Sequence, residues 1–356
     1  MEKLAQVLCD ADKACEALTM SDGSRLLLLP YGARVLGLYA AESPENFFWT
    51  NPAFERAETA RALFARDGWH NTGGDRTWIA PELDVFFTDA AHQHYWQPRQ
   101  LDMSDYQFER IGGGCRLLRE MALTLAGSQR AVRLRLRKWF GPAAHPLRHQ
   151  RGMANIAAAV QFAGYTQRIT LESLDEPFQA DALLGVWNLI QLPEGGEMVA
   201  PTYSRAVPQP CFGNVPADHL AVEDHVIRLN TDLRGSHKVA IKAAASCGRV
   251  GYFYDTGTER SLVIRNFFVN PSDEYVDRQP HDPEDLGYAV QLCRVDEAVF
   301  GSFCELEYHA PSLGALPDPA RSEDISQVWA FRGPNDAVDA IAHTLLGATP
   351  SFIGQE

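Results

Sequence analysis

The clearest periodic pattern in the chain runs through residues 131–140, where apolar and charged side chains alternate. An alternation of period two is typical of a strand in an antiparallel sheet with one buried face. The apolar set is Val132, Leu134 and Leu136, and the charged set is Arg133, Arg135 and Arg137. This arginine row could bind a sugar phosphate or a uronate. We expect it instead to form a solvent face that pairs with acidic neighbours.

Similar strand-like segments recur along the chain, separated by turns rich in Gly and Pro. They lie at residues 25–29, 33–39, 106–111, 115–125, 168–174, 183–192, 226–229, 238–243, 250–254, 262–268, 289–295 and 300–308. Many short strands without alternating helices predict a mainly β protein, a large antiparallel β sandwich with short peripheral helices.

Helical spacing of apolar residues occurs at the two ends of the chain. We predict a short N-terminal helix at about residues 1–18 and a C-terminal helix at about residues 335–347, which Gly347 ends. Residues 42–51 and 55–67 are predicted to be loops. Because no break in composition marks a boundary, we expect one domain over residues 1–356.

Charge and cysteine content restrict the partners and the compartment. The formal net charge of −14 disfavours nucleic acid and anionic membranes, which would repel the protein. Seven cysteines without CxxC spacing indicate reduced thiols, and no segment has the length and apolarity of a signal or a membrane span. These features predict a cytoplasmic protein whose partner is a small molecule.

Cofactor motifs are not found in the sequence. It has no P-loop, no Rossmann fingerprint after a strand and no Gly-x-Ser-x-Gly elbow. His92 and His94 have the spacing of two metal ligands on one face of a strand, but a third ligand is not identifiable. We therefore predict no cofactor and no metal site.

Residues 73–82 have the sequence Gly-Gly-Asp-Arg-Thr-Trp-Ile-Ala-Pro-Glu, an unusual concentration of functional side chains. Paired glycines permit a close backbone approach, Asp75 and Arg76 offer directional hydrogen bonds, and Trp78 offers a flat apolar face. Such a set suits a sugar, whose hydroxyls and ring faces need these two kinds of contact. A glycine turn entering a strand, with Arg76 in a surface ion pair, is the structural alternative.

Several stretches together carry a resemblance to a known family. Residues 29–38 look like an opening hairpin, residues 73–82 match a Gly-Gly-x-Arg-x-Trp-x-Ala-Pro-Glu pattern, and residues 186–192, 238–241 and 303–311 follow in order. They resemble the galactose mutarotase-like (aldose 1-epimerase-like) superfamily, and specifically an uncharacterised bacterial branch. The resemblance covers about residues 20–350. It implies a large antiparallel β supersandwich with a carbohydrate-facing cleft on its concave side.

The resemblance also implies a chemistry. In that superfamily a carboxylate takes the proton of the anomeric hydroxyl and a histidine protonates the ring oxygen. The base lies in a Leu-Glu step like residues 306–307, so Glu307 is the expected base. The strand that carries the acid in the family resembles residues 185–189, which contain no histidine. His70 and His94 are the candidate substitutes, and we expect His70 to serve.

Strand geometry adds Glu305 and His309 to the same face as Glu307. The expected substrate-binding residues are Asn71, Asp75, Arg76, Trp78, Glu82, Trp187, Gln191, Lys238 and Glu305. A core position for Trp78 and Trp187, or a solvated Lys238, is the structural alternative. Two functions stay open: an isomerase-like enzyme acting on a sugar or sugar acid at or near the anomeric carbon, and a non-catalytic carbohydrate-binding protein without the acid. The oligomeric state is not predicted.

Overall fold

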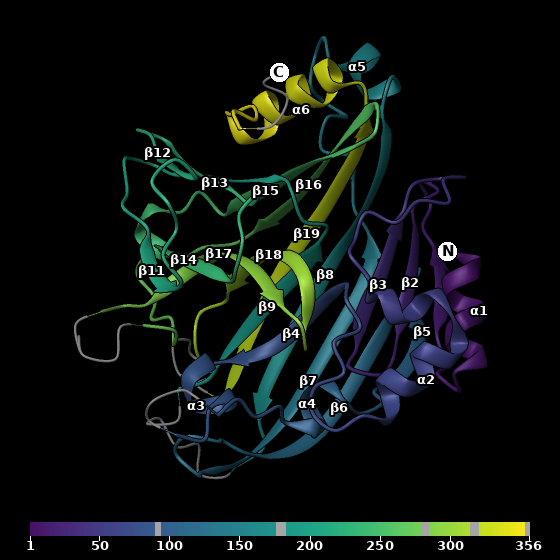
Figure 1. Cartoon of the computed structure of the whole chain (residues 1–356), viewed down its shortest axis with the longest axis vertical. Coiled ribbons are helices and arrows are strands. Elements are labelled where there is room, and N and C mark those ends of the chain that lie inside the picture. The colour runs from purple at the N-terminus through teal and green to yellow at the C-terminus, as the bar shows by residue number, and fades with distance from the viewer. Residues whose placement is uncertain (90–93, 176–182, 279–284, 314–319, 353–356) are drawn as a thin grey trace.

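Two antiparallel sheets pack face to face in the computed structural model, which describes residues 1–89, 94–175, 183–278, 285–313 and 320–352 (Figure 1). The nine-stranded sheet has the order β1 (Glu16–Thr19), β2 (Arg25–Leu29), β3 (Arg34–Tyr39), β4 (Asp75–Ala80), β9 (Gly185–Leu192), β18 (Gly301–His309), β17 (Tyr288–Glu297), β14 (His237–Lys242) and β11 (Gln209–Phe212). The ten-stranded sheet has the order β12 (Leu220–Val222), β13 (Val226–Asn230), β10 (Glu197–Pro201), β15 (Arg249–Thr256), β16 (Glu259–Phe267), β19 (Arg321–Gly333), β8 (Gln161–Ser173), β7 (Ala131–Pro142), β6 (Gly114–Thr124) and β5 (Gln107–Ile111). The predicted mainly β, antiparallel fold class is confirmed.

The alternating stretch at residues 131–140 forms most of β7. Its apolar residues Val132, Leu134 and Leu136 are buried in the core. The arginines on the opposite face form ion pairs: Arg133 with Asp175, Arg135 with Glu120 and Glu172, and Arg137 with Glu172. The arginine row is therefore the expected solvent face with acidic partners.

The helices are short and peripheral. The N-terminal helix α1 spans Glu2–Asp10, shorter than predicted because residues 16–19 already form β1, and α6 spans Asn335–Leu346. Residues 55–67, predicted to be a loop, contain helix α2 (Ala57–Ala65), which follows the 3-10 helix η1 (Pro52–Glu55). The remaining helices are α3 (Glu82–Phe86), α4 (Arg99–Asp102), α5 (Ala154–Ala158) and η2 (Ala243–Ala245). No helix in the described ranges has the length and apolarity needed to cross a membrane.

Alternation along β4 decides which of its side chains enter the space between the sheets. Asp75 is fully buried there, with its two carboxylate oxygens 2.8 and 2.9 Å from Nη2 of Arg265 on β16, and it also accepts a hydrogen bond from Tyr165 on β8. Arg76 and Trp78 point the other way because successive strand residues face opposite sides. We call the side of the nine-stranded sheet that points away from the ten-stranded sheet the outer face.

The backbone ahead of β4 requires glycine at two successive positions, Gly73 and Gly74. Gly73 and Gly74 have φ angles of +93° and +77°, which L side chains rarely adopt. A Cβ atom on Gly74 would lie 2.3 Å from the carbonyl oxygen of Val35, and one on Gly73 would lie 2.4 Å from that of Trp49. These two glycines therefore let the chain pass close to β3 and deliver Arg76 and Trp78 to the outer face.

Candidate functional site

A pocket of about 250 Å³ lies on the outer face of the nine-stranded sheet. Strands β4, β9, β18, β17 and β14 supply its floor, and helix α3 together with neighbouring loops supplies its walls. The lining residues are Trp69, Arg76, Trp78, Glu82, Phe87, Tyr95, Trp187, Leu189, Phe212, Ser236, Lys238, Cys293, Val295, Glu297, Phe300, Phe303 and Glu305. The pocket combines aromatic rings with five charged side chains.

The aromatic part is a continuous set of rings. The ring centroids of Trp69 and Trp78 lie 5.1 Å apart, and those of Trp78 and Trp187 lie 5.5 Å apart, both edge to face. Phe300 packs on Trp69 at 5.4 Å, and Tyr95 packs on Phe300 at 5.6 Å. Because such rings support one another, they present rigid apolar faces to whatever enters the pocket.

Arg76 and Glu305 form a buried ion pair across the floor. Nη1 of Arg76 lies 2.7 Å from Oε1 of Glu305, and both side chains are almost inaccessible to solvent. The Arg76 guanidinium also lies 4.1 Å from the ring centroid of Trp78. Burial alone would lower the pKa of Arg76, but the combined attraction of the nearby carboxylates, with Glu305 first among them, raises it, so the guanidinium stays charged.

Lys238 on β14 occupies the opposite part of the floor, between two carboxylates. Its Nζ lies 3.0 Å from Oε2 of Glu82, 3.3 Å from Oε2 of Glu307 and 4.7 Å from the ring centroid of Trp187. Burial alone would lower the pKa of Lys238, yet attraction to Glu307 and Glu82 raises it well above the usual value. Lys238 is therefore a charged hydrogen-bond donor at the pocket surface.

Glu307 lies behind the pocket floor and does not itself line the pocket. It is fully buried, and its Oε2 accepts a hydrogen bond of 2.9 Å from Nε1 of Trp187. Its Oε1 has no hydrogen-bond partner among the described residues. Burial raises the pKa of Glu307 to about 8; Lys238 opposes this shift, and Glu305 adds to it.

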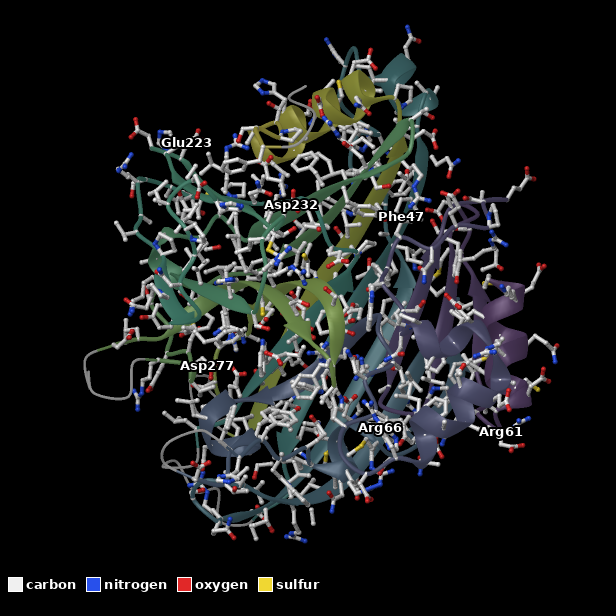
Figure 2. All side chains as sticks on the ribbon, viewed as in Figure 1. Phe47, Arg61, Arg66, Glu223, Asp232 and Asp277 are labelled. Atoms are coloured by element: carbon white, nitrogen blue, oxygen red, sulfur yellow. The ribbon has the colours of Figure 1, made fainter. Side chains whose placement is uncertain are left out.

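His309 and Gln291 extend this buried polar layer. The His309 ring stacks on Trp187 with centroids 5.5 Å apart, and within the described part of the chain neither ring nitrogen has a hydrogen-bond partner. Burial lowers the pKa of His309 to about 3, so the imidazole is neutral at physiological pH. Gln291 donates to Asp277, which lies beside α3 and accepts a hydrogen bond from the backbone N–H of Glu82 (Figure 2).

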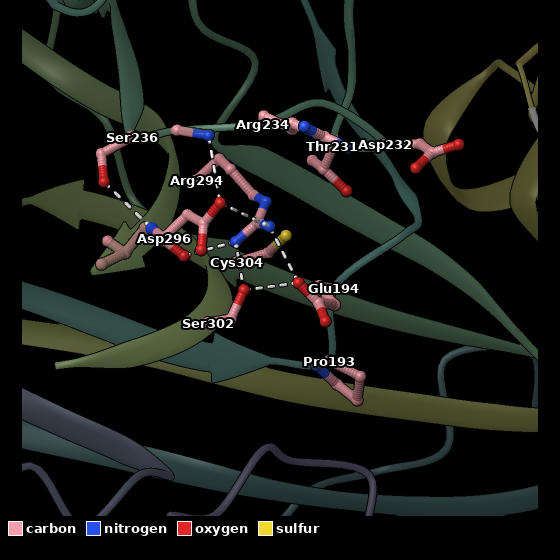
Figure 3. A network of polar contacts seen from close by, with 12 residues as sticks. Pro193, Glu194, Thr231, Asp232, Arg234, Ser236, Arg294, Asp296, Ser302 and Cys304 are labelled. Carbon is pink, nitrogen blue, oxygen red and sulfur yellow. Dashed lines mark hydrogen bonds and ion pairs between the residues drawn. The ribbon is translucent and has the colours of Figure 1, made fainter. Parts of the chain in front are cut away.

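A polar network ties together the ends of strands that carry pocket residues (Figure 3). Arg294 donates hydrogen bonds to Ser302 on β18 and to Glu194 after β9, at 2.9 and 2.8 Å. Ser236, which lines the pocket, accepts a hydrogen bond of 3.0 Å from the backbone N–H of Asp296. These contacts tie the ends of β9, β17 and β18 to one another and to the segment before β14, so side chains as well as the sheet hold these strands together.

The comparisons with known proteins reveal the family. The family described as "Family of unknown function (DUF6786)" matches residues 3–355, nearly the whole chain. The chain belongs to this family. A search of the curated proteins finds no match.

Solved structures similar to this DUF6786 protein share few identical residues with it. A GalM/aldose epimerase homologue from C. elegans is 10% identical, with a TM-score of 0.43, and the match covers 91% of this chain and 100% of that one. HI1317 is 8% identical, with a TM-score of 0.38 and coverage of 89% and 91%. The 4-alpha-glucanotransferase from Thermococcus litoralis is 9% identical, with a TM-score of 0.34; the match covers 93% of this chain but 41% of that enzyme.

Most of the residues expected to bind substrate come together in the DUF6786 protein. Six of them line the pocket: Arg76, Trp78, Glu82, Trp187, Lys238 and Glu305. Gln191 is paired with Glu305 across β9 and β18 and is buried, with no hydrogen-bond partner for its side-chain amide among the described residues. Gln191 therefore neighbours the lining residue Glu305 on the same face of the sheet without lining the pocket itself.

Asp75 and His70 lie elsewhere. Asp75 occupies the core between the sheets, so its expected contact with substrate does not fit the geometry. Nδ1 of His70 lies 2.6 Å from the Tyr31 hydroxyl and Nε2 lies 2.9 Å from the carbonyl oxygen of Arg66, so both ring nitrogens have partners within the protein. His70 does not line the pocket, and the acid expected there is not supplied by it. His94 is exposed, and His92 lies outside the described residues.

Asn71 is a supporting residue. Its side-chain amide donates a hydrogen bond of 2.9 Å to the carbonyl oxygen of Phe300, which lines the pocket. Several lining residues were missed in the sequence: Trp69, Tyr95, Phe300, Phe303 and Cys293. Trp69 is next to His70 in the chain, but its role depends on Arg76 and Trp78, which the fold brings to it.

Cys293, Glu305 and Glu307 are close enough to hold a metal ion, because one ligand atom from each lies within 4.8 Å of the others. Arg76 and Lys238 already pair with these carboxylates and would repel a cation. The carboxylates of Glu305 and Glu307 are therefore already engaged by two cations of the protein itself.

Proposed function

We propose that the pocket on the outer face binds a carbohydrate. The observation that carries this proposal is the meeting of the tryptophan rings with the Arg76–Glu305 and Lys238–Glu82 ion pairs in one small pocket. Aromatic faces pack against sugar ring C–H groups, while charged side chains exchange directional hydrogen bonds with hydroxyls. A volume of about 250 Å³ lies just below the range for drug-sized ligands and suits one sugar ring.

We further propose that the protein acts at or near the anomeric carbon by general acid and base catalysis. Glu305 and Glu307 project from the same face of β18, and Lys238 lies beside them. Proton transfer is most efficient when the pKa of the catalytic group is near the working pH, which the raised pKa of Glu307 satisfies. The resemblance of residues 73–82 and 303–311 to the aldose 1-epimerase-like superfamily supports the same chemistry.

A non-catalytic carbohydrate-binding protein is the second candidate. Two observations favour it: Glu307 lies wholly behind the floor, and no histidine lines the pocket in the ranges that the structure describes. In that case the ion pairs would serve recognition alone.

The deciding experiment combines binding and turnover on a panel of neutral monosaccharides and sugar acids. Binding is measured by calorimetry, and anomer exchange is measured by NMR, for the wild type and for Glu305→Gln. The matched control is Glu323→Gln, an exposed residue of β19 that pairs with Arg321. Exchange that is lost in Glu305→Gln alone supports the enzyme, and binding without exchange supports the binding protein. Failure of every sugar to bind at millimolar concentration contradicts both.

A further inference from the structure

The pocket floor, together with the buried Glu307 next to it, contains more acidic than basic groups. Glu82, Glu305 and Glu307 face only two cations there, Arg76 and Lys238. One negative charge is therefore left without a partner in a place with little access to water. A buried carboxylate in that position is costly, and such a group generally takes up a proton.

The contacts identify which carboxyl group takes the proton. Glu305 has Arg76 at 2.7 Å as its own partner. Glu82 keeps about a quarter of its side chain in solvent and lies 3.0 Å from Lys238. Glu307 has no solvent exposure, lies 3.3 Å from a lysine that it must share, and has one carboxylate oxygen without a partner among the described residues.

Other titratable groups around Glu307 do not supply the missing positive charge. They come from all the packed elements: Arg76 on β4, Glu82 on α3, Cys211 on β11, Lys238 on β14, Cys293 on β17, Glu305 and His309 on β18, and Asp277 before β17. Burial raises the pKa of both thiols and lowers that of His309, so these three groups are neutral at physiological pH. Asp277 is a further carboxyl group, and it increases the acidic excess.

We propose that Glu307 is held as a carboxylic acid in the resting protein and is the proton donor, while Glu305, which pairs with Arg76 at the pocket surface, is the acceptor. The assignment rests on the proposed function for its catalytic part, and it reverses the role of base expected for Glu307. Two carboxyl groups in different environments can divide the acid and base roles in this way.

The proton steps balance without a further reactant. Glu305 takes the proton of the anomeric hydroxyl, and the released O–H electron pair forms the C1=O bond. The bond between C1 and the ring oxygen breaks, and the ring oxygen receives the proton of Glu307. Rotation about C1–C2 and the reverse steps give the other anomer and return both protons. Lys238, 3.3 Å from Glu307 and itself lining the pocket, stabilises the carboxylate that forms. Because Glu307 is fully buried, its proton transfer to the sugar requires the Lys238 side chain to move aside.

The protonation of Glu307 can be tested without any sugar. Infrared difference spectra between the wild type and Glu307→Gln, recorded in steps from about pH 6 to pH 10, show whether a carboxylic acid C=O signal belongs to Glu307. We expect the signal at neutral pH and its loss as the pH rises through about 8. In Glu305→Gln the signal should be lost at a lower pH, because this variant removes a negative charge that raises the pKa of Glu307. The exposed control Glu323→Gln should keep the signal unchanged. A wild type without this signal at about pH 6 and above overturns the proposal, whatever the protein binds.

The donor role is tested by the pH dependence of anomer exchange. Wild-type exchange should fall above about pH 8, as Glu307 loses its proton. Glu307→Gln should lower the rate by about 10²–10⁴-fold and abolish that fall. The opposite result, an alkaline fall that persists in Glu307→Gln, overturns the donor role. If no sugar is bound or exchanged, the proposed function fails, while the infrared result still decides the state of Glu307.

Discussion

Replacing Asp75 with Asn tests whether β4 is divided into a core face and a pocket face. Asn has nearly the same shape as Asp but carries no charge. In Asp75→Asn the guanidinium of Arg265, which is fully buried, loses the carboxylate that lies 2.8 and 2.9 Å from its Nη2. The hydroxyl of Tyr165 loses the negative charge on its acceptor at the same time.

The cost follows from the burial of this pair. Removing one partner of a buried ion pair destabilises a protein by about 3–5 kcal/mol, because the other charge stays uncompensated. An unfolding entropy of about 2.1 cal/mol/K per residue over 356 residues gives about 0.75 kcal/mol/K. The melting temperature of Asp75→Asn should therefore fall by about 4–7 °C.

Urea and thermal unfolding measure this loss, with Asp224→Asn as the control because Asp224 is exposed and 3.9 Å from Arg205. Sugar affinity, measured by calorimetry on the folded variant, should stay within about twofold of the wild type, since Asp75 does not reach the pocket. A loss of stability below about 1 kcal/mol would refute the account of the buried pair. A stable variant that no longer binds sugar would refute the division of β4 into two faces.

Three further variants follow from the same geometry. His70→Gln should lower the free energy of unfolding by about 1–3 kcal/mol, because the buried contact with Tyr31 is lost. Sugar affinity in calorimetry should not change, and weaker binding would contradict the position of His70 outside the pocket. Trp187→Phe removes the N–H that stabilises ionised Glu307, so the pKa of Glu307, measured by infrared titration, should rise above about 8. A lower pKa in this variant would be inconsistent with that hydrogen bond. Glu307→Gln should gain stability relative to the wild type between about pH 4.5 and pH 8, measured by urea unfolding at both ends. Between these pH values folded Glu307 keeps a proton that the unfolded chain releases, so the free energy of unfolding of the wild type falls as the pH rises. A stability difference between variant and wild type that is the same at both ends would contradict the raised pKa of Glu307.

The fold could be predicted because its signal is local. Period-two alternation and turn residues mark the strands, as in β7, and they do not depend on distant partners. Helix α2 was missed for the opposite reason. Its apolar residues Ala60 and Leu63 pack in a cluster with Leu8 and Phe54, and these contacts stabilise a segment whose own helical signal is weak.

The site could be predicted only in part. Alternation along β18 placed Glu305 and Glu307 on one face, as in the structure. It could not say which face of β4 meets the pocket, because the partner that holds Asp75 in the core, Arg265, lies 190 residues further along the chain. The aromatic walls were missed for the same reason, since Trp69, Tyr95 and Phe300 come from separate segments that only the folded chain brings together.

The central claim is that a sugar binds on the outer face between the tryptophan rings and the two ion pairs. A crystal structure of the protein with the monosaccharide that binds most tightly tests it directly. We expect a sugar ring packed against Trp78 or Trp187, with hydroxyls within hydrogen-bond distance of Glu305 and Lys238. A sugar bound at another surface, with this pocket empty, would contradict it.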